Sequence, residues 1–202
     1  MIDFAATFIT FFAVIDPIGT VPVFLAVTSH FDVSSQKRIA LISTFVAAAI
    51  LLFFVVAGEF ILIAMSIPLP AFQIAGGIVL FLFALTMIFG ESKPDEEVKL
   101  VRDQRDTAIF PLAVPSIASP GAMLTAVLLT ENNRYSTWEQ AQTVSMMLAV
   151  LVVTCLLMFL AGKINRLIGT SGASVISRVM GLILASVATS NTLAGITVYF
   201  GL

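Results

Sequence analysis

Two residues able to do chemistry stand directly before prolines in the middle of long apolar runs. Asp16-Pro17 interrupts FFAVIDPIGTVPVFLAV, and Ser119-Pro120 interrupts FPLAVPSIASPGAMLTAVLL. Proline ends or kinks a helix, and a carboxylate or hydroxyl followed by proline is typical of a helix start. Each run is therefore predicted to split into two half-helices. The second half-helix would present unbonded N–H groups and a positive dipole end, which suit an anionic group such as a carboxylate.

Asp16 is the only ionisable residue deep inside an apolar run. A charge at that depth costs roughly 2.5–3.5 kcal/mol by insertion scales, and such residues usually mark a function. Three interpretations stay open for it: a helix cap, a partner for a solute amine, or a site for a coupling proton or Na+. Ser119 is either a cap or part of the same site. Gly19, Gly121 and Pro22 allow the break, and their backbone could line the cavity.

The last apolar run contains the most polar segment inside any run, residues 188–192 with the sequence ATSNT. Its threonines are predicted to pack helices against one another. Asn191 is costlier to bury, and both a cavity-lining role and a packing role stay open for it. Gln73 and Glu59 lie near the ends of their runs and are predicted to be interfacial.

The inventory of reactive side chains argues against an enzyme. Cys155 is the single cysteine and His30 the single histidine, so a disulfide, a redox cysteine pair and a thiolate metal cage are excluded. An aspartyl protease needs two carboxylates, and Asp16 stands alone. A serine nucleophile at Ser119 would need a base, and His30 lies at the wrong depth. No metal site, cofactor or nucleotide-binding loop is predicted, so an ion gradient or the solute itself would supply the energy.

The composition places these residues in a membrane. Of the 202 residues, 59% are hydrophobic and only 11% are charged, which is too apolar for a soluble domain. No basic stripe is present, so nucleic acid is not an expected partner. About 20 apolar residues span a bilayer as helix, and the N-terminal run is one of these spans rather than a signal peptide. Six such runs are predicted, at 4–28, 39–64, 68–89, 108–130, 141–162 and 174–201.

The distribution of Lys and Arg predicts the orientation. With six spans, the termini share one side with Arg134 alone, and the other nine basic residues lie on the opposite side: Lys37, Arg38, Lys93, Lys99, Arg102, Arg105, Lys163, Arg166 and Arg178. Cytoplasmic loops carry the excess of Lys and Arg. The sequence therefore predicts a multi-pass protein with both termini outside.

The two halves of the chain echo each other. Asp16-Pro17 matches Ser119-Pro120, Ala57-Gly58 matches Ala161-Gly162, and the run from Gly77 matches that from Gly181. Three spans per half force the second half to enter the membrane from the opposite face, which is the inverted-repeat plan of many secondary transporters. The predicted organisation is a first repeat at 1–89, a charged cytoplasmic linker at 90–107 and a second repeat at 108–202.

Five segments, in order and at fitting spacing, together resemble the MarC family of bacterial and archaeal membrane proteins: IDPIGTVPVFL, AGEFIL, AGGIVLFLFALTMIFG, PLAVPSIASPGA and MGLILASVAT. The resemblance implies a six-span protein of a prokaryotic inner membrane, related to the LysE-type exporters, with some relatives associated with transport of glycine and alanine. It singles out Asp16, Pro17, Gly19, Pro22, Pro115, Pro120 and Gly121. The chain departs from the family pattern at Thr20 (usually Asn), Ser119 (usually Gly), Ser190 (often Gln) and Ala194 (often acidic).

Together these features predict an all-α secondary transporter of small neutral amino acids that works by alternating access. Its site is expected at the bilayer midplane between the broken first and fourth spans, with Thr20 among the solute-binding residues. The alternatives are an efflux protein for drugs or small metabolites, a channel, and a non-transporting scaffold. The expected partners are the lipid bilayer and a small solute. Small residues such as Gly181 and Ala185 could pack within the chain or in a homo-oligomer.

Overall fold

The structure, a computed structural model, describes residues 3–89, 107–132 and 134–201, which form helices and no strand. In chain order the helices are α1 (Phe4–Ile15), α2 (Pro17–Thr28), α3 (Val33–Ala64), α4 (Leu69–Phe89), η2 (Ala108–Ile117), α7 (Pro120–Leu128), α8 (Thr137–Phe159) and α9 (Ala161–Phe200). The predicted all-α class is confirmed.

Six stretches can cross a bilayer. The pair α1 and α2, the helices α3, α4 and α8, and residues 174–200 of α9 are each long and apolar enough, and η2 with α7 is a sixth candidate that bends by 55°. Five of the six predicted spans are thus confirmed as helices that could span a bilayer, and the sixth corresponds to the bent pair. Several ends differ from the prediction: α8, for example, covers Thr137–Phe159 rather than 141–162. Helix α3 begins at Val33 rather than 39, because the Asp32 carboxylate caps it. Residues 162–172, which lie before the last predicted span, are helical as part of α9, which has a kink at Gly169 (φ 67°).

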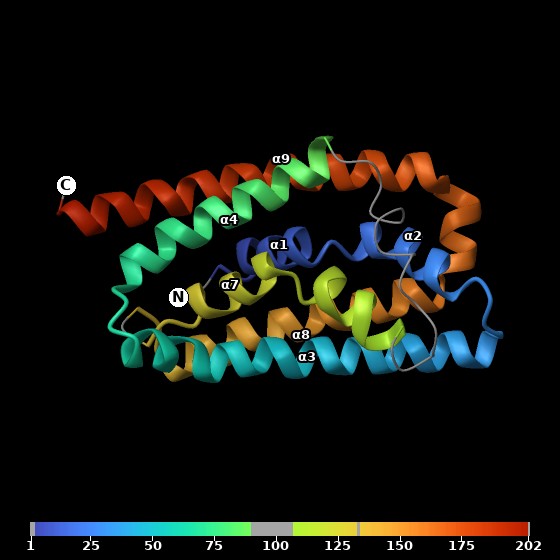
Figure 1. The fold of residues 1–202 in the computed structure, drawn as a ribbon, viewed down its shortest axis with the longest axis horizontal. Coiled ribbons are helices and arrows are strands. Elements are labelled where there is room, and N and C mark those ends of the chain that lie inside the picture. The colour runs from blue at the N-terminus through green and yellow to red at the C-terminus, as the bar shows by residue number, and fades with distance from the viewer. Residues whose placement is uncertain (1–2, 90–106, 133, 202) are drawn as a thin grey trace.

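Successive spans run in alternating directions, so matching spans of the two halves run in opposite directions (Figure 1). Helices α4 and α9 lie side by side along one edge, α3 and α8 lie along the opposite edge, and the broken spans lie between them. Both ends of the described chain lie toward the α3–α4 and α7–α8 connections. This alternation is what the predicted inverted arrangement requires. The predicted linker at 90–107 lies, except for residue 107, outside the described residues, so the repeat boundaries stay a prediction.

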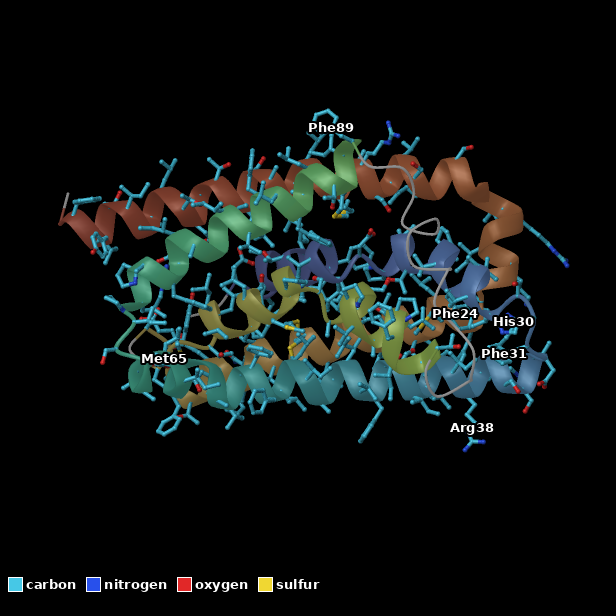
Figure 2. All side chains as sticks on the ribbon, viewed as in Figure 1. Phe24, His30, Phe31, Arg38, Met65 and Phe89 are labelled. Atoms are coloured by element: carbon cyan, nitrogen blue, oxygen red, sulfur yellow. The ribbon has the colours of Figure 1, made fainter. Side chains whose placement is uncertain are left out.

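Local signals set the helix ends. Ser136 and Glu139 form the predicted capping box at the start of α8: the serine oxygen accepts from the Glu139 N–H and the glutamate accepts from the Ser136 N–H. Asp3 caps α1 through the N–H groups of Ala5 and Ala6. Figure 2 places His30 and Arg38 at one end of the bundle and Met65 at the other, as the alternation of spans requires.

Small residues bring α4 and α9 into close contact. A Cβ added at Gly77 would lie 2.9 Å from the Ala188 carbonyl oxygen and 3.0 Å from the Thr192 nitrogen, and Gly181 approaches Met87 in the same way. The Thr192 hydroxyl donates to the Ala188 carbonyl of its own helix, so it needs no hydrogen-bond partner from α4 at this contact, here called the α4–α9 seam. Backbone approach through small residues is the usual means of association where lipid removes the hydrophobic drive. Gly181 therefore packs within the chain.

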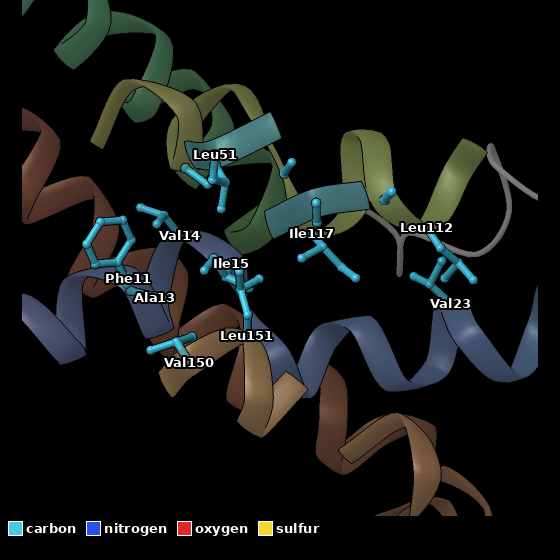
Figure 3. Packing of buried hydrophobic residues seen from close by; sticks show 14 of the residues in the cluster. Phe11, Ala13, Val14, Ile15, Val23, Leu51, Leu112, Ile117, Val150 and Leu151 are labelled. Carbon is cyan, nitrogen blue, oxygen red and sulfur yellow. The ribbon is translucent and has the colours of Figure 1, made fainter. Parts of the chain in front are cut away.

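The buried core lies around the broken spans. Figure 3 shows Ile15, at the end of α1, with Ile117, at the end of η2, and Leu51 of α3 and Leu151 of α8 beside them. The outward faces of the spans are apolar as well, with large exposed side chains such as Phe45 and Phe60 on α3. An apolar exterior around a packed interior is what a lipid environment requires. Both helix breaks therefore lie in the packed interior of the bundle.

Candidate functional site

The first break lies at Asp16, as predicted. This residue adopts the left-handed conformation (φ 49°, ψ 66°) between α1 and α2, and its side chain is 1% exposed. One carboxylate oxygen, Oδ1, accepts from the Gly19 N–H at 3.0 Å, which caps α2. The Thr20 hydroxyl donates to the Asp16 carbonyl at 3.0 Å. Asp16 thus serves as a cap, whatever further role it has.

The second break lies at Ala118 and Ser119, between η2 and α7. The Ser119 side chain is fully buried, and its oxygen accepts from the Ala122 N–H at 3.1 Å. The same hydroxyl donates to the Val14 carbonyl of α1 at 3.1 Å. This hydrogen bond joins the segments at the two breaks, and its two residues are 105 apart in sequence. Ser119 is therefore both a cap and a link between the halves.

A residue that sequence reasoning missed also meets the first break. The Ser177 hydroxyl of α9 donates to Asp16 Oδ2 at 3.1 Å. Gly19 leaves the room for this arrangement, because a Cβ at this position would lie 2.6 Å from Asp16 Cγ and from Ser177 Oγ. Residues 171–177, SGASVIS, contain three serines, and no sequence pattern distinguishes one from another. Only the fold therefore identifies Ser177 as a partner of Asp16. The carboxylate is thus held by two elements, α2 and α9.

The two breaks place backbone N–H groups and one hydroxyl where they could bind a solute. Ile18 and Gly121 each stand at the second position of a half-helix, in the first turn, where an α-helix has no intrahelical acceptor for its N–H groups. Ser116, one turn before the second break, is 1% exposed, and its hydroxyl has no partner within the described residues. Buried polar groups are normally satisfied, so these groups suit water or a polar solute.

The four prolines named from the sequence take different places. Pro17 and Pro120 occupy the first turns of α2 and α7, directly after the two breaks. Pro115 lies in η2, where Val114 has an extended backbone (φ −134°, ψ 126°). Pro22 lies inside α2, which continues through it, so the interruption of this span is at Asp16. Among the described residues, no group of three His, Cys, Asp or Glu side chains could hold a metal ion.

Asn191 lies apart from the breaks, on the wall of a separate cavity of about 140 Å³. The cavity also contains Gln73, which was predicted to be interfacial, and residues that sequence reasoning missed: Thr10, Thr125, Glu131 and Arg134. Thr10 precedes one break by six residues and Thr125 follows the other by six, and this shared spacing is the signal that could have found them. Glu59, in contrast, anchors the α7–α8 connection by accepting from the Asn132 N–H at 2.8 Å.

The electrostatics of this cavity centre on Glu131, which follows α7 outside the membrane-spanning segments. Burial raises the pKa of the Glu131 carboxyl, the neighbouring Arg134 lowers it, and Glu59 raises it further. Arg134 also lies over the Tyr135 ring, with its guanidinium carbon 5.6 Å from the ring centroid. The cavity therefore combines one partly desolvated acid with one base.

Comparison with known proteins agrees with this architecture. The sequence model of the MarC family integral membrane proteins matches residues 1–200. A UPF0056 membrane protein from the archaeon Methanocaldococcus jannaschii is 32% identical over 96% of this chain and 95% of its own length. A second one, from Pyrococcus abyssi, is 32% identical over 98% of this chain and 96% of its own length. A third, from the bacterium Buchnera aphidicola subsp. Schizaphis graminum, is 33% identical over 89% of this chain and 84% of its own length. No solved structure matches the chain. The chain belongs to the MarC family of integral membrane proteins.

Proposed function

We propose that this protein is a secondary transporter of small neutral amino acids such as glycine and alanine. The observation that carries the proposal is the junction of two helix breaks in the core, where the Ser119 hydroxyl binds the Val14 carbonyl beside the buried Asp16. Discontinuous helices that meet within the membrane are the binding sites of many inverted-repeat transporters. An enzyme would need a pair of reactive groups, whereas Asp16, the buried acid at the breaks, supplies a single group.

In the proposed complex, the N–H groups of Ile18 and Gly121 bind the solute carboxylate, because they stand at the positive ends of the two half-helices. Asp16 receives the solute amine or a coupling proton or Na+. Its Oδ2 accepts from Ser177 in this conformation. Movement of α9 away from α2 would exchange that hydroxyl for the amine and open the site, which is one half of an alternating-access cycle.

The small side chains around the breaks favour small solutes over drugs. Gly19, Thr20, Ser119 and Gly121 are all buried within one turn of a break. A drug-sized ligand needs a cavity of about 300–1,000 Å³ lined by large apolar groups. Efflux of drugs is therefore the weaker candidate.

We also infer that the protein lies in the cytoplasmic membrane of a prokaryote with both termini outside. The excess of Lys and Arg on the side of His30 and Arg38 supports this orientation. The relatives, which are membrane proteins of bacteria and archaea, support a location in a prokaryotic membrane. Energy would come from a solute or ion gradient, without a bound cofactor.

The test is counterflow of labelled glycine and alanine in liposomes that contain the purified protein, comparing wild type with Asp16→Asn. Asparagine can still cap a helix, so the substitution removes the charge more than the cap. The matched control is Asp32→Asn, which makes the same change at the exposed cap of α3. Gel filtration verifies that each variant is folded.

Counterflow that is lost in Asp16→Asn and kept in Asp32→Asn would support the proposal and give Asp16 more than a capping role. Counterflow that persists in Asp16→Asn would limit Asp16 to structure and leave the backbone N–H groups as the binding site. Absence of counterflow in folded wild-type protein would remove small neutral amino acids as solutes, and the efflux and scaffold alternatives would then lead.

A further inference from the structure

The cavity that contains Asn191 lies between the α4–α9 edge of the bundle and the two broken spans. Thr10 comes from α1, Gln73 from α4, Thr125 from α7 and Asn191 from α9, and the connection after α7 closes it with Glu131. It lies toward the end at which both termini are found, because α4 begins there and α7 ends there (Figure 1). Its walls therefore meet on the side where the protein is proposed to face outward.

The cavity is separate from the helix breaks. Thr10 and Thr125 are each six residues from a break, which is about 9 Å along a helix at 1.5 Å per residue. None of Asp16, Gly19, Ser119 or Gly121 lines it. A solute held there would lie on the path from the outside to the breaks without occupying them.

Polar groups in the walls have unused hydrogen-bonding capacity. The side-chain amides of Gln73 and Asn191 make no hydrogen bond within the described part of the chain, although both residues are half-buried. Thr125 is 4% exposed, and Leu128 and Val187 supply apolar wall. Half-buried amides without partners are costly unless water or a ligand bonds them.

The volume limits what can bind. A water molecule occupies about 30 Å³ in the liquid, so 140 Å³ holds a solute of roughly five heavy atoms. Drug-sized pockets begin at about 300 Å³. The carboxylate of Glu131 and the guanidinium of Arg134 in the wall suit a solute that carries both an ammonium and a carboxylate.

We propose that this cavity is an outer binding site for small zwitterions, in which Glu131 binds the ammonium group and Arg134 binds the carboxylate. The amides of Gln73 and Asn191 complete the hydrogen bonds of the ligand. The choice of ligand rests on the proposed transport function, whereas the location rests on the cavity itself. Burial has already removed part of the water from Glu131, as its raised pKa records, and an ammonium group would replace that lost solvation.

Thiol labelling tests the site directly. Cys155 is the single cysteine and is buried, so Cys155→Ala gives a background without thiols. Gln73→Cys or Asn191→Cys then places one thiol in the wall of the cavity. The rate at which this thiol reacts with a membrane-impermeant maleimide, measured with and without glycine, shows whether glycine occupies the cavity. The control Thr137→Cys lies in the exposed first turn of α8, outside the cavity. We expect glycine to slow labelling at 73 and 191 and to leave 137 unchanged.

Charge variants then test the two proposed ligands of the zwitterion. Glu131→Gln and Arg134→Gln, each added to Asn191→Cys, should raise the glycine concentration that gives half-protection at least tenfold. Glu59→Gln is the matched control, because it removes a carboxylate beside the cavity and keeps an acceptor for the Asn132 N–H. The same half-protecting glycine concentration in Asn191→Cys alone and in its combinations with Glu131→Gln, Arg134→Gln and Glu59→Gln would overturn the assignment of Glu131 and Arg134.

Labelling and counterflow together separate the two proposals. Counterflow without protection at 73 and 191 would overturn the outer site and leave transport standing. Protection without counterflow would establish the site and overturn transport. Protection that survives Asp16→Asn would show that the outer site is independent of the break, and protection that is lost with Asp16→Asn in a folded protein would overturn two separate sites. Absence of both signals would overturn both proposals.

Discussion

Replacement of Gly19 by alanine should disturb the first helix break through sterics alone. The new Cβ would lie 2.6 Å from both Asp16 Cγ and Ser177 Oγ, whereas ordinary van der Waals contact for a Cβ begins at 3.4 Å. Both the carboxylate and the Ser177 hydroxyl must therefore shift, and the carboxylate must shift most, because its Oδ2 would lie closer to the new Cβ than either of these atoms. Movement of the carboxylate would stretch its 3.0 Å bond to the residue-19 N–H and its 3.1 Å bond to Ser177.

The expected cost follows from these two effects. Overpacking of a buried site costs about 1–3 kcal/mol, and loss of a helix cap costs about 1 kcal/mol. Gly19→Ala should therefore lower the free energy of unfolding by about 2–4 kcal/mol and reduce counterflow, since Asp16 leaves its position. Denaturant titration in detergent micelles measures the first quantity, and the liposome assay measures the second.

Gly162→Ala is the matched control, because a Cβ at Gly162, in the first turn of α9, meets no atom within 4 Å. It should leave stability unchanged or raise it by up to about 1 kcal/mol, as alanine favours the helix. If Gly19→Ala unfolds at the same denaturant concentration as wild type and transports equally well, the close packing of Asp16, Gly19 and Ser177 is not the native arrangement.

Three further predictions concern the inter-break bond, the α4–α9 seam and Glu131. Ser119→Ala removes both a cap and the bond to the Val14 carbonyl, so it should cost about 2 kcal/mol in denaturant titration, against about 1 kcal/mol for the surface cap variant Ser136→Ala; equal losses would contradict the link between the breaks. Gly77→Ala should cost about 1–3 kcal/mol, because its Cβ meets the backbone of α9, and an unchanged unfolding midpoint would contradict the seam. Burial raises the pKa of Glu131, so the folded protein binds this proton more tightly than the unfolded chain, and the stability that the group contributes at low pH is lost as pH rises through the raised pKa. Glu131→Gln should accordingly unfold at a higher temperature than wild type at pH 7, with the difference vanishing at acidic pH; a lower midpoint at pH 7 would contradict desolvation as the cause.

The spans and their interruptions could be predicted because they depend on neighbouring residues. A proline lacks its N–H wherever it lies, and a carboxylate three residues before an N–H can cap it without help from the rest of the chain. This is why Asp16-Pro17, Ser119-Pro120 and the capping box at Ser136 were predicted at the residues where the structure has them. Length and apolarity in the same way predict six spans, and an odd number in each half predicts that the halves are inverted.

The partners across the core could not be predicted, because packing alone selects them. The bond from Ser119 to Val14 joins residues 105 apart, and that from Ser177 to Asp16 joins residues 161 apart. Many serines could have reached a break, and no sequence period distinguishes the one that does. The sequence suggested Asn191 for the same site as Asp16, whereas the structure places it with Gln73 and Glu131 in a different cavity.

The sequence by itself determined that this chain has several helices apolar enough to cross a membrane, with breaks at Asp16 and Ser119 and one acid buried at the first break, since these are consequences of local backbone chemistry and of the cost of charge in lipid. Only the tertiary structure decided which hydroxyls hold that acid and which polar side chains share a cavity. Those choices depend on how closely helices approach at small residues, as at Gly19 between α2 and α9 and at Gly77 between α4 and α9, and a distance between helices is a property of the packed whole.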